Sequence, residues 1–188
     1  LPGSPKREGH SLQAGANNMS RQLEPYQLIE RSIQKKFHKV LWTPFITAIK
    51  QYELIAPGDR IAVCISGGKD SMLMAKLLQL LQRHSDVPFE VIDLVMDPGY
   101  NAVNRQKIES NAALLHIPVT IFETNIFDVT SGIEQSPCYL CARMRRGYLY
   151  SKARELGCNK IALGHHFSDV VETTVMGCLL YTSPSPRD

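Results

Sequence analysis

A buried strand that runs into a glycine-rich loop at the head of a helix is the feature that most constrains the fold of this chain. The apolar run 61–65 is followed at once by Ser66-Gly67-Gly68-Lys69-Asp70-Ser71 and then by a helical pattern. The two glycines allow the backbone to approach a ligand closely. The helix directs its unpaired N–H groups and the positive end of its dipole at the same point, where Lys69 adds a full charge. A phosphate group is the natural occupant, so the loop predicts a nucleotide-binding domain.

Two common phosphate-binding motifs do not fit this loop. It has neither the spacing of the Walker A motif nor that of the G-x-G-x-x-G dinucleotide fingerprint. The structural alternative is a strand-to-helix turn in which the glycines serve only to keep the turn tight.

Strands and helices alternate along most of the chain. Strands are predicted at 60–65, 89–96, 118–123 and 160–163, and helices at 70–83, 103–116, 138–156 and from 168 onward. This alternation predicts an α/β fold, with a parallel sheet and helices on both faces. Ligands in such sheets bind beyond the carboxyl ends of the strands. The Ser66 loop, Asp97, and Gly164 with His165 all fall at such ends.

The chain divides into four predicted segments. An N-terminal helical segment at 21–56 has apolar residues four or five positions apart, and Pro44 is expected to divide it into two helices. The nucleotide-binding domain follows at 57–177 and is expected to be incomplete at its C-terminal end. Residues 1–20 are expected to be a disordered or non-native leader. The tail 178–188 resembles sequencing-adapter read-through and is expected to be non-native, the alternative being a flexible Ser/Pro tail.

Composition narrows the class of protein. Apolar residues make up 44% of the chain and charged residues 21%, as in an ordinary soluble globular protein. No apolar run approaches the ~18 residues of a membrane span, and no signal peptide opens the chain, so the expected location is cytoplasmic. The five cysteines include Cys138-x-x-Cys141, which favours metal or redox chemistry over a disulfide framework.

Cys138 and Cys141 follow Pro137 at the predicted start of a helix, and their spacing places both on one helical face. The helix dipole and the nearby Arg143 and Arg145 favour thiolates. Thiolates in this position suit a soft metal, an iron–sulfur cluster or persulfide chemistry. Two ligands are too few for a closed metal site. The alternatives are a thioredoxin-like redox pair and two helical cysteines without a role.

Basic residues cluster in two runs. The run between Gln135 and Arg154 holds five basic residues: Arg143, Arg145, Arg146, Lys152 and Arg154. Tyr150 lies on the same helical stripe as three of these arginines, which suits a phosphate backbone and a stacked base. The second run, in the N-terminal helical segment, comprises Arg31, Lys35, Lys36 and Lys39. Each run alone is more often a solvated face, but beside a nucleotide loop and a thiol pair they favour an RNA partner.

The fourth predicted strand is followed by Gly164, His165 and His166, and the last helix then carries Asp169 and Glu172. The glycine permits a close backbone turn, and the imidazoles can donate to phosphate oxygens. The two carboxylates, three residues apart on a helix, suit a Mg²⁺ ion that bridges phosphates.

Together these motifs resemble the tRNA 2-thiocytidine biosynthesis family, a branch of the PP-loop ATP pyrophosphatase superfamily. Ser66 to Ser71 is similar to the S-G-G-x-D-S signature of that superfamily. The other matching motifs are Cys138-Tyr139-Leu140-Cys141, the arginines that follow it, and Gly164-His165-His166 through Asp169. The resemblance spans about 31–177 and implies the adenine nucleotide alpha hydrolase-like fold.

The resemblance implies an enzyme that adenylates the C2 oxygen of an anticodon-loop cytidine in tRNA and then replaces that oxygen with sulfur. ATP would bind at Ser66, Gly67, Gly68, Lys69, Asp70, Ser71, Asp97, Gly164 and His165. The catalytic residues would be Lys69, Asp70, Cys138 and Cys141, and the RNA-binding residues Arg143, Arg145, Arg146 and Arg154. The expected partners are tRNA and a sulfur donor such as a cysteine desulfurase, with a homodimer as a possible assembly.

The resemblance also implies two metal groups. Family members carry a 4Fe–4S cluster on three cysteines, of which Cys138 and Cys141 match two, and the third lies beyond this chain. The usual Asp-Asp pair that holds Mg²⁺ reads Ser168-Asp169 here, so only Asp169 keeps that role.

Other members of the superfamily provide the alternatives. Enzymes of the 2-thiouridine type also use cluster-binding cysteines, and the target base cannot be read from the sequence. Lysidine synthetases are not expected to need the thiol pair. A nucleotide-binding iron–sulfur module, or an inactive fragment without catalysis, is the non-enzymatic alternative.

Overall fold

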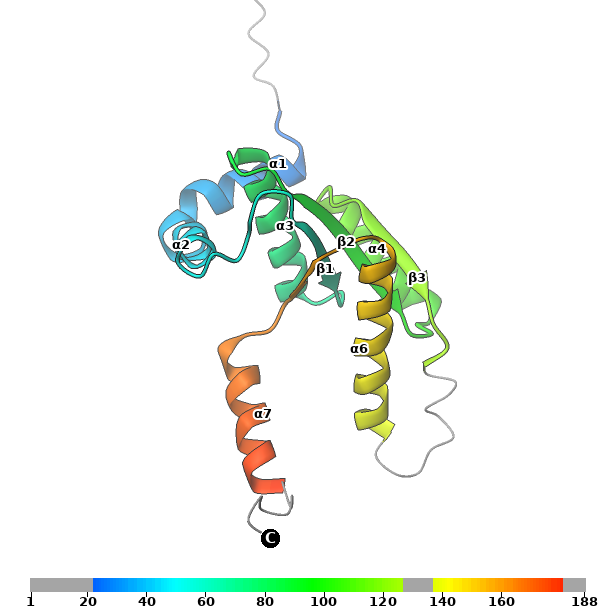
Figure 1. Cartoon of the computed structure of the whole chain (residues 1–188). Coiled ribbons are helices and arrows are strands. Elements are labelled where there is room, and N and C mark those ends of the chain that lie inside the picture. Colours follow the sequence, from blue (N-terminus) through cyan, green and yellow to red (C-terminus); the bar gives the residue numbers. More distant parts are fainter. Residues whose placement is uncertain (1–21, 127–136, 181–188) are drawn as a thin grey trace, which may run out of the picture.

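The computed structural model describes residues 22–126 and 137–180 and shows a parallel sheet flanked by helices, of which the last extends away from the sheet (Figure 1). The strands are β1 (Arg60–Ile65), β2 (Glu90–Asp97), β3 (Val119–Glu123) and β4 (Lys160–Leu163). The helices after β1 are α3 (Lys69–His84), α4 (Ala102–Leu114), α6 (Pro137–Glu155) and α7 (Phe167–Leu180). The predicted α/β alternation is confirmed, and β1 and β4 have the predicted bounds.

All strand pairs are parallel, and the strand order is β3-β2-β1-β4. The chain therefore builds outward from β1 to β3 and then returns to add β4 on the other side of β1. The strand order reverses between β1 and β4, and a crevice at such a point is where open α/β sheets bind ligands. The loops that follow β1 and β4 are thereby brought next to each other.

The two faces of β1 are covered by different helices. Its alternate residues Ile61, Val63 and Ile65 pack with residues of α3 and α4, while Ala62 packs with Ala153 of α6. Because both faces are buried, the strand reads as a continuous apolar run rather than as an alternating one. Within the described residues, no helix combines the length and the apolar character that a bilayer crossing would require.

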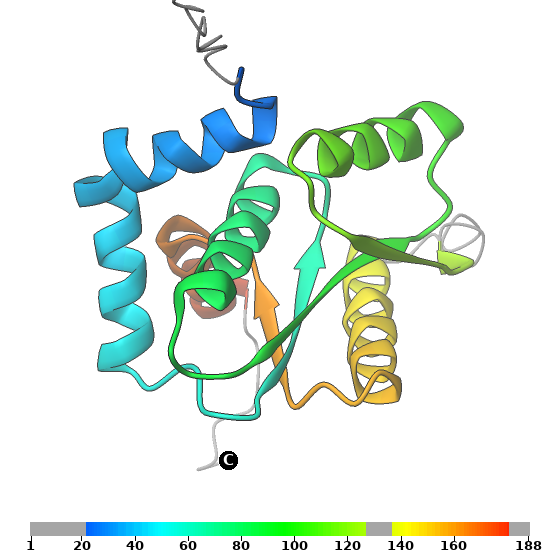
Figure 2. The ribbon, with the colours of Figure 1, turned by 90° about the horizontal axis from the view of Figure 1, so that it is seen from above.

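The N-terminal helical segment forms an arm across α3, consisting of α1 (Pro25–Arg31), η1 (Ser32–Lys36), η2 (His38–Trp42) and α2 (Thr43–Gln51). The segments η1 and η2 are π-helical. The arm turns a corner near Phe37, whose backbone leaves the helical region at φ −100° and ψ 14° (Figure 2). The segment does divide in two, but at Phe37 and not at Pro44. Proline is tolerated in the first turn of a helix, where its missing N–H has no partner to lose, and Pro44 occupies such a position in α2.

A buried acid lies beneath α3. The side chain of Asp93 on β2 is 3% exposed, and its Oδ1 atom has no hydrogen-bond partner among the described residues. Burial raises the pKa of Asp93 to about 7, although the charge of Lys76 acts in the opposite direction. Burial disfavours the ionised form of a carboxyl group, so the folded chain loses stability at pH values where Asp93 would ionise.

We expect Asp93→Asn to flatten the dependence of stability on pH. In the unfolded chain Asp93 ionises near pH 4, whereas in the folded chain it ionises near pH 7. Between these values the folded chain binds more protons, so its free energy of unfolding falls as pH rises. Urea unfolding should therefore show the variant gaining stability over the parent chain from pH 4 to pH 8. The exposed Asp86→Asn is the control, and an equal difference at both pH values would contradict this prediction.

Candidate functional site

The loop between β1 and α3 is held by serine hydrogen bonds and shaped by a glycine. The Ser66 N–H donates to Ser71 Oγ at 3.1 Å, and the Ser71 hydroxyl donates to the Gly68 carbonyl oxygen at 3.0 Å. Gly67 has φ +86°, and a Cβ there would lie 2.7 Å from Cγ1 of Ile108. Both observations favour glycine at position 67. The loop is thus braced from within, with its backbone exposed at the carboxyl end of β1.

The N-terminus of α3 is open to an anion. Gly68 is its N-cap, in an extended conformation, and no side chain among the described residues caps this end. The first N–H groups of a helix have no intrahelical acceptor, and the dipole adds partial positive charge there. The neighbouring Lys69 side chain is 84% exposed. These groups together form the kind of site that binds phosphate.

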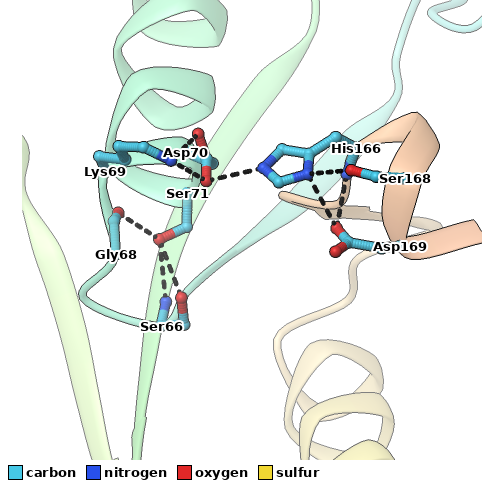
Figure 3. Close-up of polar contacts among 8 residues, drawn as sticks. All are labelled: Ser66, Gly68, Lys69, Asp70, Ser71, His166, Ser168 and Asp169. Atoms are coloured by element: carbon cyan, nitrogen blue, oxygen red, sulfur yellow. Dashed lines mark hydrogen bonds and ion pairs between the residues drawn. The ribbon is translucent and has the colours of Figure 1, made fainter. Parts of the chain in front are cut away.

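Asp70 lies between a lysine and a histidine (Figure 3). Lys69 Nζ donates to both of its carboxylate oxygens, at 3.1 and 2.9 Å, and His166 Nε2 lies 3.0 Å from its Oδ2 atom. The hydrogen bond from Lys69, followed by that with His166, holds the pKa of Asp70 below its usual value. Asp70 is therefore an anion that joins the first turn of α3 to the segment after β4.

The start of α7 is organised around the same histidine. The His166 N–H donates to Asp169 Oδ2 at 2.7 Å, and His166 Nδ1 lies 3.2 Å from the Ser168 hydroxyl oxygen and 3.4 Å from Asp169 Oδ2. The carboxylates of Asp70 and Asp169 thus both contact one imidazole (Figure 3). The sequence predicted that these segments would meet, but the site residues assigned from it included His165 and not His166.

His165 takes a different position from His166. It lines a small hollow of about 270 Å³ with Asp169, Val170, Thr173 and Thr174. The two adjacent histidines look equivalent in sequence. The direction in which the chain leaves β4 decides that His166 contacts Asp70 whereas His165 lines the hollow.

Gly164 lets the end of β4 touch the start of α3. A Cβ at Gly164 would lie 2.9 Å from both the Cα and the N atoms of Ser71. The contact atoms are backbone, which cannot move aside as a flexible side chain would. Gly164 is therefore placed where the two loops come together, as the sequence predicted.

Asp97, the last residue of β2, shapes the next loop. Its Oδ1 atom accepts hydrogen bonds from the N–H groups of Gly99 and Tyr100, at 2.9 and 2.6 Å, and its Oδ2 atom lies 3.4 Å from Arg105 Nη1. Asp97 is buried, with 5% of the residue exposed. The structure thus places Asp97 at the predicted strand end, with its carboxylate engaged in holding the loop.

The basic residues of α6 differ in environment. Arg143, Arg146 and Arg154 are exposed, as a nucleic-acid contact requires. The Arg145 guanidinium instead donates through Nη2 to the Tyr100 hydroxyl at 3.0 Å, and its Nε atom is buried. Arg145 thus ties α6 to the loop after β2.

The described cysteines form no cluster of metal ligands. The Cys138 side chain lies outside the described residues, and Cys141 is half-buried one helical turn further along α6. Cys64 is buried in β1, where burial raises the pKa of its thiol to about 11. Among the described side chains, no group of three or more His, Cys, Asp or Glu residues is arranged to hold a metal ion.

A larger hollow of about 490 Å³ lies elsewhere, between the arm, α3 and β4. Its lining is mostly apolar and includes Phe45, Ile49, Ile55, Leu78 and Ile161. Its two charged lining residues are Glu53 and Lys160, and Lys160 is already paired with Asp59 and with the Leu54 carbonyl oxygen.

Comparison with known proteins places these features in a family. Residues 29–184 match the family described as PP-loop domain. A tRNA-cytidine(32) 2-sulfurtransferase of Citrifermentans bemidjiense is 39% identical over 132 residues, which cover 69% of this chain and 52% of the relative. A protein of the same name from Nitrosospira multiformis is 37% identical over 150 residues, covering 78% and 50%. The chain spans about half the length of these curated relatives.

A solved structure shares the fold. It is described as the U34-tRNA thiolase NcsA from Methanococcus maripaludis with its [4Fe-4S] cluster, and it superposes with a TM-score of 0.59 at 23% identity. The match covers 74% of this chain and 51% of that one. With a family match over most of its residues and a phosphate-binding loop in the expected place, the chain belongs to the PP-loop domain family.

Proposed function

We propose that this chain is the ATP-binding part of a tRNA sulfurtransferase that modifies an anticodon-loop cytidine. One observation carries the proposal. The Ser66 loop, which leads into the uncapped N-terminus of α3, lies against the segment Gly164–His166 at the place where the strand order of the sheet reverses. The curated relatives carry the name tRNA-cytidine(32) 2-sulfurtransferase, which supports the choice of cytidine.

The proposed reaction has two steps. In the first, the C2 oxygen of the cytidine attacks the α-phosphorus of ATP, the bond from that phosphorus to the β-phosphate bridging oxygen breaks, and pyrophosphate leaves. In the second, a sulfur nucleophile attacks C2, and AMP departs with the oxygen. Adenylation is useful because AMP is a far better leaving group than an oxide.

The residues of this chain serve the first step. The free N–H groups at the start of α3 and the exposed Lys69 ammonium would bind the phosphates and stabilise the charge that develops as pyrophosphate leaves. Asp70 would hold Lys69 in position, since both of its carboxylate oxygens accept from Nζ. Asp169 would offer a carboxylate oxygen to a Mg²⁺ ion, whose charge would help to neutralise the phosphates of ATP.

The second step needs sulfur, which Cys138 and Cys141 are proposed to handle. Among the described side chains, Cys141 does not belong to any group of three or more potential metal ligands. Two cysteines are too few to hold a 4Fe–4S cluster by themselves. A sulfur donor such as a cysteine desulfurase would supply the atom.

Pyrophosphate release tests the proposal. The full chain with ATP, Mg²⁺ and tRNA should release pyrophosphate, and the rate should depend on the tRNA. Binding of ATP without release would favour a nucleotide-binding module. Mass spectrometry of the nucleosides, with a sulfide donor present, would then separate cytidine from uridine as the modified base.

A further inference from the structure

The outer face of the arm carries an uncompensated positive charge. Four of its cations, Arg31, Lys35, Lys36 and Lys39, are here called the arm cations, and all four are exposed. No acidic residue occurs between Glu30 and Glu53. Glu30 itself turns inward, where it pairs with Lys76 at 2.7 Å and Arg83 at 2.6 Å. Within residues 22–126 and 137–180, none of the arm cations forms an ion pair.

The spacing of residues in the arm separates its two faces. Apolar residues recur every four positions, at Ile29, Ile33, Phe37, Leu41, Phe45 and Ile49. The cations Arg31, Lys35 and Lys39 have the same period but lie two positions out of phase, which is half a turn in a helix of four residues per turn. An α-helix has about 3.6 residues per turn, so a period of four would drift around it.

The π-helical turns explain how the period is accommodated. A π-turn closes its hydrogen bond one residue further along the chain than an α-turn and therefore holds more residues. Mixing α- and π-turns brings the average close to four, which keeps most of these apolar residues on the inner side and the cations outside; Phe37, at the corner of the arm, is the exception and is exposed. Burial agrees with this account, since Ile33 is 4% exposed whereas Arg31, Lys35 and Lys39 are exposed.

The apolar face of the arm is already occupied. Ile33 is buried against Leu77 and Leu80 of α3, with Leu41, Trp42 and Phe45 packed around them. A basic amphipathic helix often binds a membrane surface or the groove of a partner protein, but either mode needs a free apolar face. The arm therefore offers its cations together with a few exposed apolar side chains, Leu28, Phe37 and Val40, rather than a continuous free apolar face.

An exposed aromatic ring accompanies the arm cations. Phe37, at the corner of the arm, is 41% exposed, and Lys36 Nζ lies 5.2 Å from the centre of its ring. Clustered cations with an accessible aromatic ring form a surface that suits a phosphate backbone and an unpaired base.

We propose that the arm cations and Phe37 bind the tRNA substrate through the backbone of nucleotides other than the one that reacts. This inference rests on the proposed function. The arm packs on Leu77 and Leu80, which lie about 12 to 16 Å along α3 from Lys69 at a rise of about 1.5 Å per residue. Figures 1 and 2 show the arm and α6 on either side of α3. An RNA held by both basic surfaces would span the Ser66 loop.

The test is tRNA binding by the full chain across a range of salt concentrations. The triple variant Lys35→Gln, Lys36→Gln, Lys39→Gln should bind tRNA at least about tenfold more weakly at low salt, and its slope of log affinity against log salt should be shallower by about 2. The single variant Lys35→Gln should weaken binding, whereas the matched Lys107→Gln on the exposed side of α4 should not. Circular dichroism and melting temperature should be unchanged, since all these side chains are exposed.

Four outcomes separate this inference from its rivals. Unchanged affinity and salt slope in the triple variant would overturn it, as would binding of the parent chain to phosphatidylserine vesicles but not to tRNA. In pyrophosphate release, the triple variant should show a raised KM for tRNA with kcat retained, because the arm is remote from Lys69. If the parent chain releases no pyrophosphate but the triple variant still binds tRNA more weakly, the proposed function fails and the arm inference stands.

Discussion

Replacing Lys69 by alanine is expected to lower the rate of tRNA-dependent pyrophosphate release by about 10²- to 10³-fold, the range typical of removing one preorganised group that stabilises developing charge. Lys69 is placed for this role by the first turn of α3, next to N–H groups that no side chain caps. Its only partner among the described residues is Asp70. When the triphosphate binds, the ammonium can keep a hydrogen bond to that carboxylate and donate its remaining hydrogens to the phosphates.

The fold should survive this change. The Lys69 side chain is 84% exposed, and ion pairs at a protein surface contribute little to stability. The melting temperature of Lys69→Ala should therefore equal that of the parent chain, and the loss should be confined to nucleotide binding and turnover. Lys107→Ala on α4 is the matched control. Undiminished pyrophosphate release by Lys69→Ala would remove Lys69 from the mechanism.

Much of the fold could be predicted because its signals are local. The continuous apolar run of β1, the glycine pair after it and the helical pattern of α3 are all read within a few residues. The observed β1 bounds, Arg60–Ile65, are those predicted. The meeting of the loops after β1 and β4 was also predicted, because parallel strands end at one edge of a sheet.

What the sequence did not reveal depends on contacts between distant segments. His165 and His166 are chemically identical, and only the packing of β4 against β1 decides that His166 reaches Asp70. Arg145 reads as one more cation of α6, yet its partner is Tyr100, 45 residues earlier. The π-turns were likewise missed, although the four-residue apolar period of the arm was a signal that could have indicated them.

The second large effect is expected for Gly164→Ala, which should damage both stability and catalysis. The added Cβ would lie 2.9 Å from two backbone atoms of Ser71, so the end of β4 must move away from α3. Overpacking of this kind costs about 1–3 kcal/mol, which for a domain of this size lowers the melting temperature by several degrees. The same movement would draw His166 away from Asp70, and a misplacement of about 1 Å in a catalytic site can reduce the rate by about 10²-fold.

Gly147 provides the matched control, because the same substitution there should increase the stability of the chain instead of decreasing it. It lies within α6, and a Cβ at this position would meet nothing within 4 Å. Alanine is more favourable than glycine inside a helix by about 0.5–1 kcal/mol, so Gly147→Ala should raise the melting temperature slightly. Urea unfolding and pyrophosphate release of the two variants, measured side by side, would check both effects. If Gly164→Ala kept the stability and rate of the parent chain, the close contact between β4 and α3 would not be what aligns the two loops.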